Sequence, residues 1–297
     1  MSGRSVNDLG KPSLPYRVDR RCRGLCGFET LKDSRKEDLF RAKRLRKATK
    51  CFPEEIEGPS ALALGAQLER AGNGDDVPAS LSSSTTMRGL RINIIGAVWS
   101  LIMMVGLKAL HGFTIIPATW EFSADELPNV NPVWLMNSLR AALYARGARK
   151  AKGWIIAFIH GEWDPIGKIF RLHVHGLAYG DMVEVIDRLR KLPNYKTQKY
   201  LKDGTLSPVY RRIKMTRKPL TNLPRPITYL LQSYWPQRAL FISDDGARRR
   251  ARRKRRIAEP QHSQVLLWLD KWNIRDLTLM VGLRVTKTGL QQTKSVS

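Results

Sequence analysis

Residues 153–180 have the sequence GWIIAFIHGEWDPIGKIFRLHVHGLAYG, in which two apolar runs are joined by a short polar segment. Both runs, 154–163 and 170–179, are rich in β-branched and aromatic residues and are typical of strands, because such side chains pack well on a pleated surface. The segment between them, DPIG at 164–167, consists of turn-forming residues. The sequence therefore predicts a β-hairpin.

The second predicted strand contains His173-Val174-His175. Side chains alternate between the two faces of a strand, so both imidazoles project from one face, about 7 Å apart along the chain, while Val174 points into the apolar layer. Imidazole is a good ligand for several divalent ions, and two of them in an apolar strand need a reason to be retained. The pair predicts a metal site, and the alternative is two histidines brought together by chance.

A third ligand is expected from the preceding strand, where Glu162 and His160 share one face. Oxygen donors suit Mg²⁺ or Mn²⁺, so Glu162 is the first choice and His160 the second. The alternative for Glu162 is an exposed charge at the end of a strand.

Outward from the hairpin, residues 113–122 (FTIIPATWEF) and 209–215 (VYRRIKM) predict further strands. Asn131-Pro132 is a good helix start, Asp181 can cap another helix, and residues 226–235 predict a third. The order β-α-β-β-α-β-α indicates an α+β fold, with a mostly antiparallel central sheet and helices packed on it.

The segment 92–107 (INIIGAVWSLIMMVGL) has no charged residue. It is shorter than the roughly 20 residues that a membrane-spanning helix needs, and it carries Asn93 and Ser100. A buried helix is expected here, without stable membrane association.

The charge balance is strongly basic: 52 Lys and Arg face 26 Asp and Glu, a formal net charge of +26. Nucleic acid is the first candidate partner of such a chain, and an anionic membrane is the second. Three cysteines are too few for a disulfide framework, and the N-terminus lacks the apolar core of a signal peptide, so a cytoplasmic protein is expected.

Composition also predicts three regions. Residues 1–87 would be a basic N-terminal arm followed by a flexible linker, 88–240 the folded domain, and 241–297 an arginine-rich segment with a short helical tail. The basic runs of the arm, RRCRG and RAKRLRK, are either solvated charge or contacts to DNA. The run RRRARRKRR at 248–256 is either a solvated tail or a phosphate-binding arm with the DNA-binding residues Arg248, Arg249, Arg250, Arg252, Arg253, Lys254, Arg255 and Arg256.

Four segments between residues 111 and 238 occur in a characteristic order. They are the strand Phe113–Thr119, the approach Gly153-Trp154 to Glu162-Trp163-Asp164, the strand motif His173-Val174-His175, and Tyr229-Leu230-Leu231-Gln232. In this combination the chain resembles the HUH endonuclease superfamily, specifically the rolling-circle replication initiators of plasmids and phages. Gln232 departs from the family's third motif, Tyr-x-x-Lys, so the charge of that lysine must come from elsewhere.

The resemblance implies an RRM-like HUH nuclease domain that nicks and rejoins one DNA strand to initiate rolling-circle replication. A divalent ion, Mg²⁺ or Mn²⁺, would be held by the histidines, and a tyrosine would form a 5′-phosphotyrosyl link and release a 3′-OH. The implied partners are DNA, as a single strand or an origin duplex, and the host replication machinery. The implied catalytic residues are Tyr229 and Tyr234.

On the helix expected at 226–235 the two tyrosines would point about 140° apart. Tyr234 falls on an apolar stripe and is expected to anchor the helix, so Tyr229 is the expected nucleophile. Arg225, one turn before Tyr229, could supply the charge that Gln232 lacks.

Other functions remain open at this point. The same chemistry serves HUH transposases and relaxases. A basic nucleic-acid-binding module without catalysis would need no metal, and a metal hydrolase would cleave phosphodiesters without a tyrosine.

Overall fold

The computed structural model describes residues 29–76, 78–105, 110–200, 207, 209–220, 227–228, 230–232, 234–238, 240–242, 248–250 and 254–293. Its helices are α1 (Leu31–Cys51), α2 (Gly58–Asn73), α3 (Ser84–Val105), η2 (Leu127–Asn129), α4 (Pro132–Ala145), α5 (Met182–Arg188), η3 (Leu189–Lys191), η4 (Pro193–Tyr195) and α6 (Gln261–Asp270). Its strands are β1 (Leu110–Ile115), β2 (Glu121–Ser123), β3 (Gly153–Asp164), β4 (Ile169–Gly180), β5 (Ile213–Met215), β6 (Pro236–Gln237), β7 (Leu240–Ile242), β8 (Arg248–Arg250), β9 (Arg255–Arg256), β10 (Thr278–Val281), β11 (Leu283–Thr286) and β12 (Gly289–Gln292).

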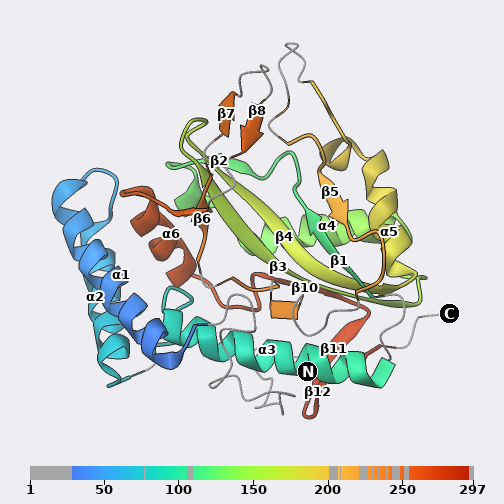
Figure 1. Ribbon diagram of the computed structural model, residues 1–297, viewed down its shortest axis with the longest axis horizontal. Coiled ribbons are helices and arrows are strands. Elements are labelled where there is room, and N and C mark those ends of the chain that lie inside the picture. Colours follow the sequence, from blue (N-terminus) through green and yellow to red (C-terminus); the bar gives the residue numbers. More distant parts are fainter. Residues whose placement is uncertain are drawn as a thin grey trace.

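The hairpin of β3 and β4 is the centre of a large, curled sheet (Figure 1). The strand order is β5-β1-β4-β3-β6-β9, with β2 on β4 and β10 on β3. All these pairs are antiparallel except β3 with β6. The predicted α+β class, a mostly antiparallel sheet with helices packed on it, is confirmed.

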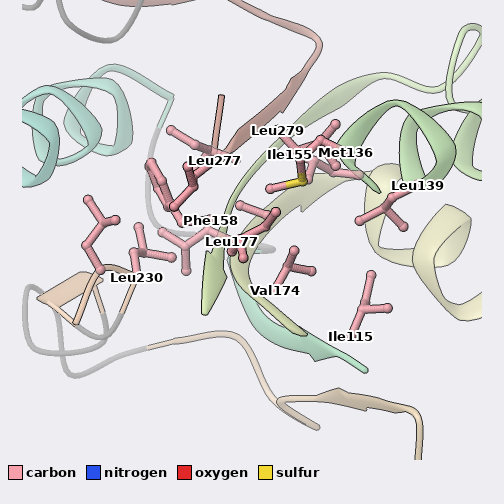
Figure 2. Packing of buried hydrophobic residues seen from close by; sticks show 14 of the residues in the cluster. Ile115, Met136, Leu139, Ile155, Phe158, Val174, Leu177, Leu230, Leu277 and Leu279 are labelled. Atoms are coloured by element: carbon pink, nitrogen blue, oxygen red, sulfur yellow. The ribbon is translucent and has the colours of Figure 1, made fainter. Parts of the chain in front are cut away.

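Apolar residues of the sheet and of the surrounding helices form one large core. Val174 is fully buried in it, as its position between the two histidines predicts, and Figure 2 shows it among Ile115, Leu177 and Leu139 of α4. The start of α4 is also as predicted: the Asn131 side chain accepts hydrogen bonds from the Val133 and Trp134 amides, ahead of Pro132.

Residues 92–105 of this apolar segment belong to α3, which among the described residues is the helix long and apolar enough to span a membrane. However, Ile94, Val98, Leu101 and Ile102 are at most 1% exposed in the core of the protein itself. The prediction of a buried helix is therefore confirmed for these residues.

The prediction of a flexible linker over 52–87 is wrong for residues 58–73, which form α2. Pro59 stands in the first turn, where its missing N–H costs nothing, and Gly74 ends the helix in the left-handed conformation. Leu64 and Leu68 are buried against α1 and against Leu266 of α6. The Gly and Pro residues that suggested a linker instead mark the ends of a helix.

The C-terminal residues also differ from the predicted tail. Strand β10 pairs with β3, and the indole N–H of Trp268 in α6 donates to the Val130 carbonyl at 2.9 Å. The arginine-rich run is not a free tail either, because β8 pairs with β7, and β9 pairs with β6. The contacts of β10 and of Trp268 join residues more than 100 positions apart in the chain. Sequence periodicity cannot reveal such contacts.

The helix predicted over 226–235 is not formed in the described part of that segment. Ile227 and Thr228 form a short turn, bends follow, and β6 begins at Pro236. The residue before a proline avoids helical geometry, and Trp235 instead packs its ring over Gly161, where an added Cβ would lie 2.3 Å from the ring. Tyr234 is 45% exposed, so its predicted role as a buried anchor is wrong.

The start of α3 depends on a buried carboxylate from α1. Asp38, which is fully buried, accepts hydrogen bonds from the Ser83 hydroxyl at 2.9 Å and the Thr85 amide at 3.1 Å, and also from the Ser84 amide. Asp38 thus satisfies the first amides of α3 and places a negative charge at the positive end of its dipole.

We expect Asp38→Ala to lower the free energy of unfolding by about 3 kcal/mol, because it leaves several buried donors unpaired. Urea denaturation would measure the change. Asp33→Ala, which removes an exposed carboxylate from the first turn of α1, is the control and should cost much less. Equal losses in the two variants would contradict this account of α3.

Candidate functional site

Register across the strands brings polar side chains together on one face of the sheet. His173 lies opposite His160 of β3, and His175 lies opposite Thr114 of β1. Thr114 in turn lies opposite Lys214 of β5. Residues directly opposite each other in a sheet lie on the same face, so four strands contribute to one site.

His173 and His175, hereafter the histidine pair, converge as predicted. Their Nε2 atoms lie 3.3 Å apart. Two imidazole nitrogens on one ion, each about 2.1 Å from it, would be separated by about 3.0–3.4 Å in octahedral or tetrahedral geometry. Two nitrogen lone pairs at this distance repel unless a proton or a cation lies between them. The spacing of the histidine pair thus matches either an N–H···N hydrogen bond between the two rings or two ligands of one divalent ion.

The other ring nitrogens are held by neighbours. His175 Nδ1 is 2.9 Å from the Thr114 hydroxyl, and His173 Nδ1 is 3.2 Å from the Arg171 carbonyl oxygen. Because a carbonyl oxygen only accepts, His173 Nδ1–H donates to Arg171, which leaves the Nε2 lone pair of neutral His173 directed at His175 Nε2. This arrangement is the usual second layer around metal-binding histidines.

Burial favours the neutral form of His175 and of His160. Desolvation, reinforced by the nearby His160 and His173, lowers the pKa of His175 well below its ordinary value. Burial also lowers the pKa of His160 to about 3, with a further contribution from His173. Neutral imidazole is the form that binds metal ions.

The two predicted third ligands have other partners in the structure. Glu162 Oε1 accepts from Arg171 at 3.4 Å, and His160 Nε2 donates to the Leu230 carbonyl at 2.6 Å. In the part of the chain that the structure describes, no group of three or more His, Cys, Asp or Glu side chains is arranged to hold a metal. The remaining coordination positions of an ion on the histidine pair would fall to water or to substrate oxygen.

The histidine pair lines a pocket of about 260 Å³. Its basic side chains come from separate parts of the chain: Lys214 from β5, Arg238 after β6, and Lys254 before β9. The wall of the pocket is formed by Thr114, Ile116, His160, Gly161, Glu162, Arg171, His173, His175, Lys214, Gln232, Pro236, Arg238 and Lys254. A pocket with this excess of positive charge suits an anion.

Arg171 is committed to neighbouring carboxylates. Its guanidinium lies 3.0 Å from Glu121, 3.4 Å from Glu162 and 3.6 Å from Asp164, and it is 2% exposed. Arg212 also contacts Glu121, at 3.2 Å. These buried ion pairs position the strand ends beside the pocket, and an arginine already paired in this way contributes little charge to an incoming anion.

Lys254 belongs to the arginine-rich run and lines the pocket. Its ammonium donates to Gln232 Oε1 at 3.4 Å. Burial and the positive charge of Arg238 lower the pKa of Lys254. Lys254 therefore places a positive charge beside Gln232, the residue that stands where the Tyr-x-x-Lys motif has its lysine.

The other predicted DNA-binding residues are distributed differently. Arg255 and Arg256 are exposed on β9, while Arg248, Arg249 and Arg250 form β8. Arg225, Arg252 and Arg253 lie outside the described residues.

Of the two predicted catalytic residues, Tyr229 also lies outside the described residues. Tyr234 does not line the pocket and lies near Arg256. Sequence reasoning did not identify Thr114, Lys214 or Arg238. The alternation of side chains along 113–115 and 213–215 could have placed the first two on one face, but only with the strand order known.

Comparisons with models of known protein families, with curated proteins and with solved structures find no match for this chain.

If the histidine pair binds metal, Thr114→Val should weaken Mn²⁺ binding about 10- to 100-fold, because it removes the group that orients His175. Titration of Mn²⁺, followed by electron paramagnetic resonance of the free ion, would measure the affinity. His173→Ala and His175→Ala should abolish binding. His111→Ala, on the same strand as Thr114 but outside the pocket, is the control. Unchanged affinity in Thr114→Val and in both alanine variants of the histidine pair would contradict the site.

Proposed function

We propose that the protein is a metal-dependent endonuclease that nicks and rejoins a single DNA strand, in the manner of the HUH replication initiators that its motifs resemble. The observation that carries the proposal is the histidine pair, with its Nε2 atoms 3.3 Å apart, on the wall of a cationic pocket. An antiparallel sheet with this pair on an interior strand is compatible with the RRM-like HUH architecture.

The charges around the pocket favour a phosphodiester as the ligand. Lys214, Arg238 and Lys254 surround the histidine pair, and the whole chain has a formal charge of +26. Phosphate contacts by Lys and Arg supply most of the sequence-independent affinity for nucleic acid. A divalent ion on the histidine pair would polarise the phosphate as a Lewis acid.

The proposed reaction is a transesterification. The tyrosine oxygen attacks phosphorus, the bond from phosphorus to the 3′ oxygen breaks, and the 3′ oxygen leaves as a hydroxyl after taking up a proton. The tyrosine loses its own proton, and the phosphate stays linked to the 5′ side. Because one phosphoester replaces another, the strand can be rejoined by the reverse attack without an external energy source.

Tyr229 is the proposed nucleophile on the basis of its neighbours in the chain. The next residue, Leu230, accepts the hydrogen bond of His160 through its carbonyl, and Gln232 lines the pocket. Tyr234 lies half-exposed near Arg256 and does not line the pocket. The segment around Tyr229 is thus attached directly to the site.

The first test is a covalent adduct. The protein is incubated with a pool of single-stranded oligonucleotides and Mn²⁺, and a denaturation-resistant protein–DNA band is sought. Tyr229→Phe should lose the band, because it removes only the hydroxyl, whereas Tyr234→Phe should retain it. His173→Ala, His175→Ala and excess EDTA should each abolish it.

Each other outcome identifies a different function. Cleavage without an adduct would indicate a metal hydrolase, and binding without cleavage would indicate a non-catalytic nucleic-acid-binding protein. Loss of the band in Tyr234→Phe alone would identify Tyr234 as the nucleophile instead. If the protein initiates replication, rather than transposition or plasmid mobilisation, a DNA polymerase should extend the released 3′-OH.

Lys254 offers a second test of the pocket. Lys254→Gln should lower the cleavage rate tenfold or more, equivalent to about 1.4 kcal/mol of transition-state stabilisation, because the charge facing the phosphate is lost. Arg255→Gln removes the same charge from the adjacent, exposed position and should change the rate much less. Single-turnover kinetics at saturating oligonucleotide would measure both. Equal effects would show that Lys254 contributes only general electrostatics.

A further inference from the structure

The outward face of α1 carries a row of lysines. Lys36, Lys43, Lys47 and Lys50 are all exposed, and at 100° per residue they fall within about 60° of one another around the helix axis. Along the axis they span about 21 Å. Between residues 36 and 50 the same face includes Leu39 and Phe40 but no acidic residue. These four side chains are called the lysine face below.

The arginines of α1 are used differently. Arg41 pairs with Glu37 at 2.9 Å, Arg44 pairs with Glu259 at 2.5 Å, and Arg46 pairs with Glu69. The first pair lies within α1, the second joins α1 to the segment before α6, and the third joins α1 to α2. In contrast, Lys43, Lys47 and Lys50 have no ion-pair partner within the described parts of the chain. Like charges three and four residues apart destabilise a helix, and the described residues place no carboxylate within ion-pair distance of these three lysines.

A chain of contacts connects α1 to the pocket. The Arg256 guanidinium lies 2.5 and 2.7 Å from the two carboxylate oxygens of Glu37 and 4.4 Å from the ring centroid of Phe40. Two residues earlier, Lys254 lines the pocket. Figure 1 places α1 beside α6, on the side of the sheet where β6 lies. Arg256 therefore ties the lysine-bearing helix α1 to the short segment that supplies Lys254 to the pocket.

We propose that the lysine face binds the phosphate backbone of duplex DNA next to the strand held in the pocket. The choice of DNA in this inference rests on the proposed function. A row of lysines about 21 Å long suits a linear polyanion. Proteins that hold single strands combine basic groups with free stacking aromatics. Here the guanidinium groups of Arg44 and Arg256 already lie over the Phe40 ring, 5.5 and 4.4 Å from its centroid, which favours contacts to the backbone alone.

An anionic membrane is the less suitable partner. A helix that lies on a membrane inserts its apolar face among the lipids. The apolar face of α1, formed by Ala42, Leu45 and Ala48, is instead buried against α2 and α6. The exposed face offers Leu39 and Phe40, each 39% exposed, between the lysines.

The test compares two quadruple variants with equal loss of charge. One replaces Lys36, Lys43, Lys47 and Lys50 by Gln. The control replaces Lys150, Lys191, Lys196 and Lys287, which are also exposed but lie outside α1, α2 and α6. Affinity of the full chain for a 20-base-pair duplex is measured by fluorescence anisotropy in EDTA over a range of NaCl concentrations. Circular dichroism verifies folding, and the double variants K36Q/K43Q and K47Q/K50Q replace the first variant if it is unfolded.

The lysine-face variant should bind the duplex at least tenfold more weakly than the control at 100 mM NaCl. Its plot of log affinity against log salt concentration should be less steep by about 0.9 for each phosphate that the variant no longer neutralises. Equal affinities and slopes in the two variants would overturn the proposal. So would unchanged duplex affinity combined with abolished binding to vesicles containing phosphatidylserine, which would identify a membrane surface instead.

The outcome is independent of catalysis. His173→Ala should bind the duplex as the wild type does, because the assay contains no metal and the contacts are made by lysines. If the wild type forms no covalent adduct while the lysine-face variant still shows the reduced slope, the proposed nicking activity fails and the duplex-binding surface stands.

Discussion

The register between β3 and β4 is the constraint on which the rest of the structure depends. It places His160 opposite His173 and Glu162 opposite Arg171 across twelve paired positions. A slip of one residue would exchange the two faces of a strand, sending both histidines into the apolar layer and Val174 into the pocket. Burial on both faces makes that slip prohibitive, because Val174, Leu172 and Ile159 are needed in the core. The apolar residues thus determine the position of the polar ones.

Short strands, which would not be stable in isolation, complete the site beside this buried hairpin. Strands β5, β6 and β9 contain three, two and two residues, yet with the adjoining residues they supply Lys214, Arg238 and Lys254. Each is held by pairing with a longer neighbour or with another short strand at the sheet edge. The hairpin therefore supplies the two facing imidazole nitrogens, and the short strands at the sheet edge supply the cations of the pocket.

Basic residues have two distinct roles in this chain. Arg171, Arg91 and Arg41 are buried and paired with carboxylates, a use that suits the planar, multidentate guanidinium. The lysines of α1 point outward, and Lys254 faces the pocket. The basic residues of this chain, whose formal net charge is +26, are thus not used evenly: some pair with buried carboxylates, and others face solvent or the pocket.

The sequence by itself determined the central hairpin, the α+β class, the start of α4, the burial of α3 and the convergence of His173 and His175. All of these follow from local periodicity or from capping within a few residues, where backbone geometry alone decides which side chains share a face. Tertiary contacts alone place 58–73 as a helix against α1 and α6, set the Trp235 ring over Gly161, and pair Glu162 with Arg171. They also place Lys254 beside Gln232 and pair β10 with β3. These features depend on contacts between segments far apart in the chain, and the free energy of such contacts overrides the local preference that a single sequence displays.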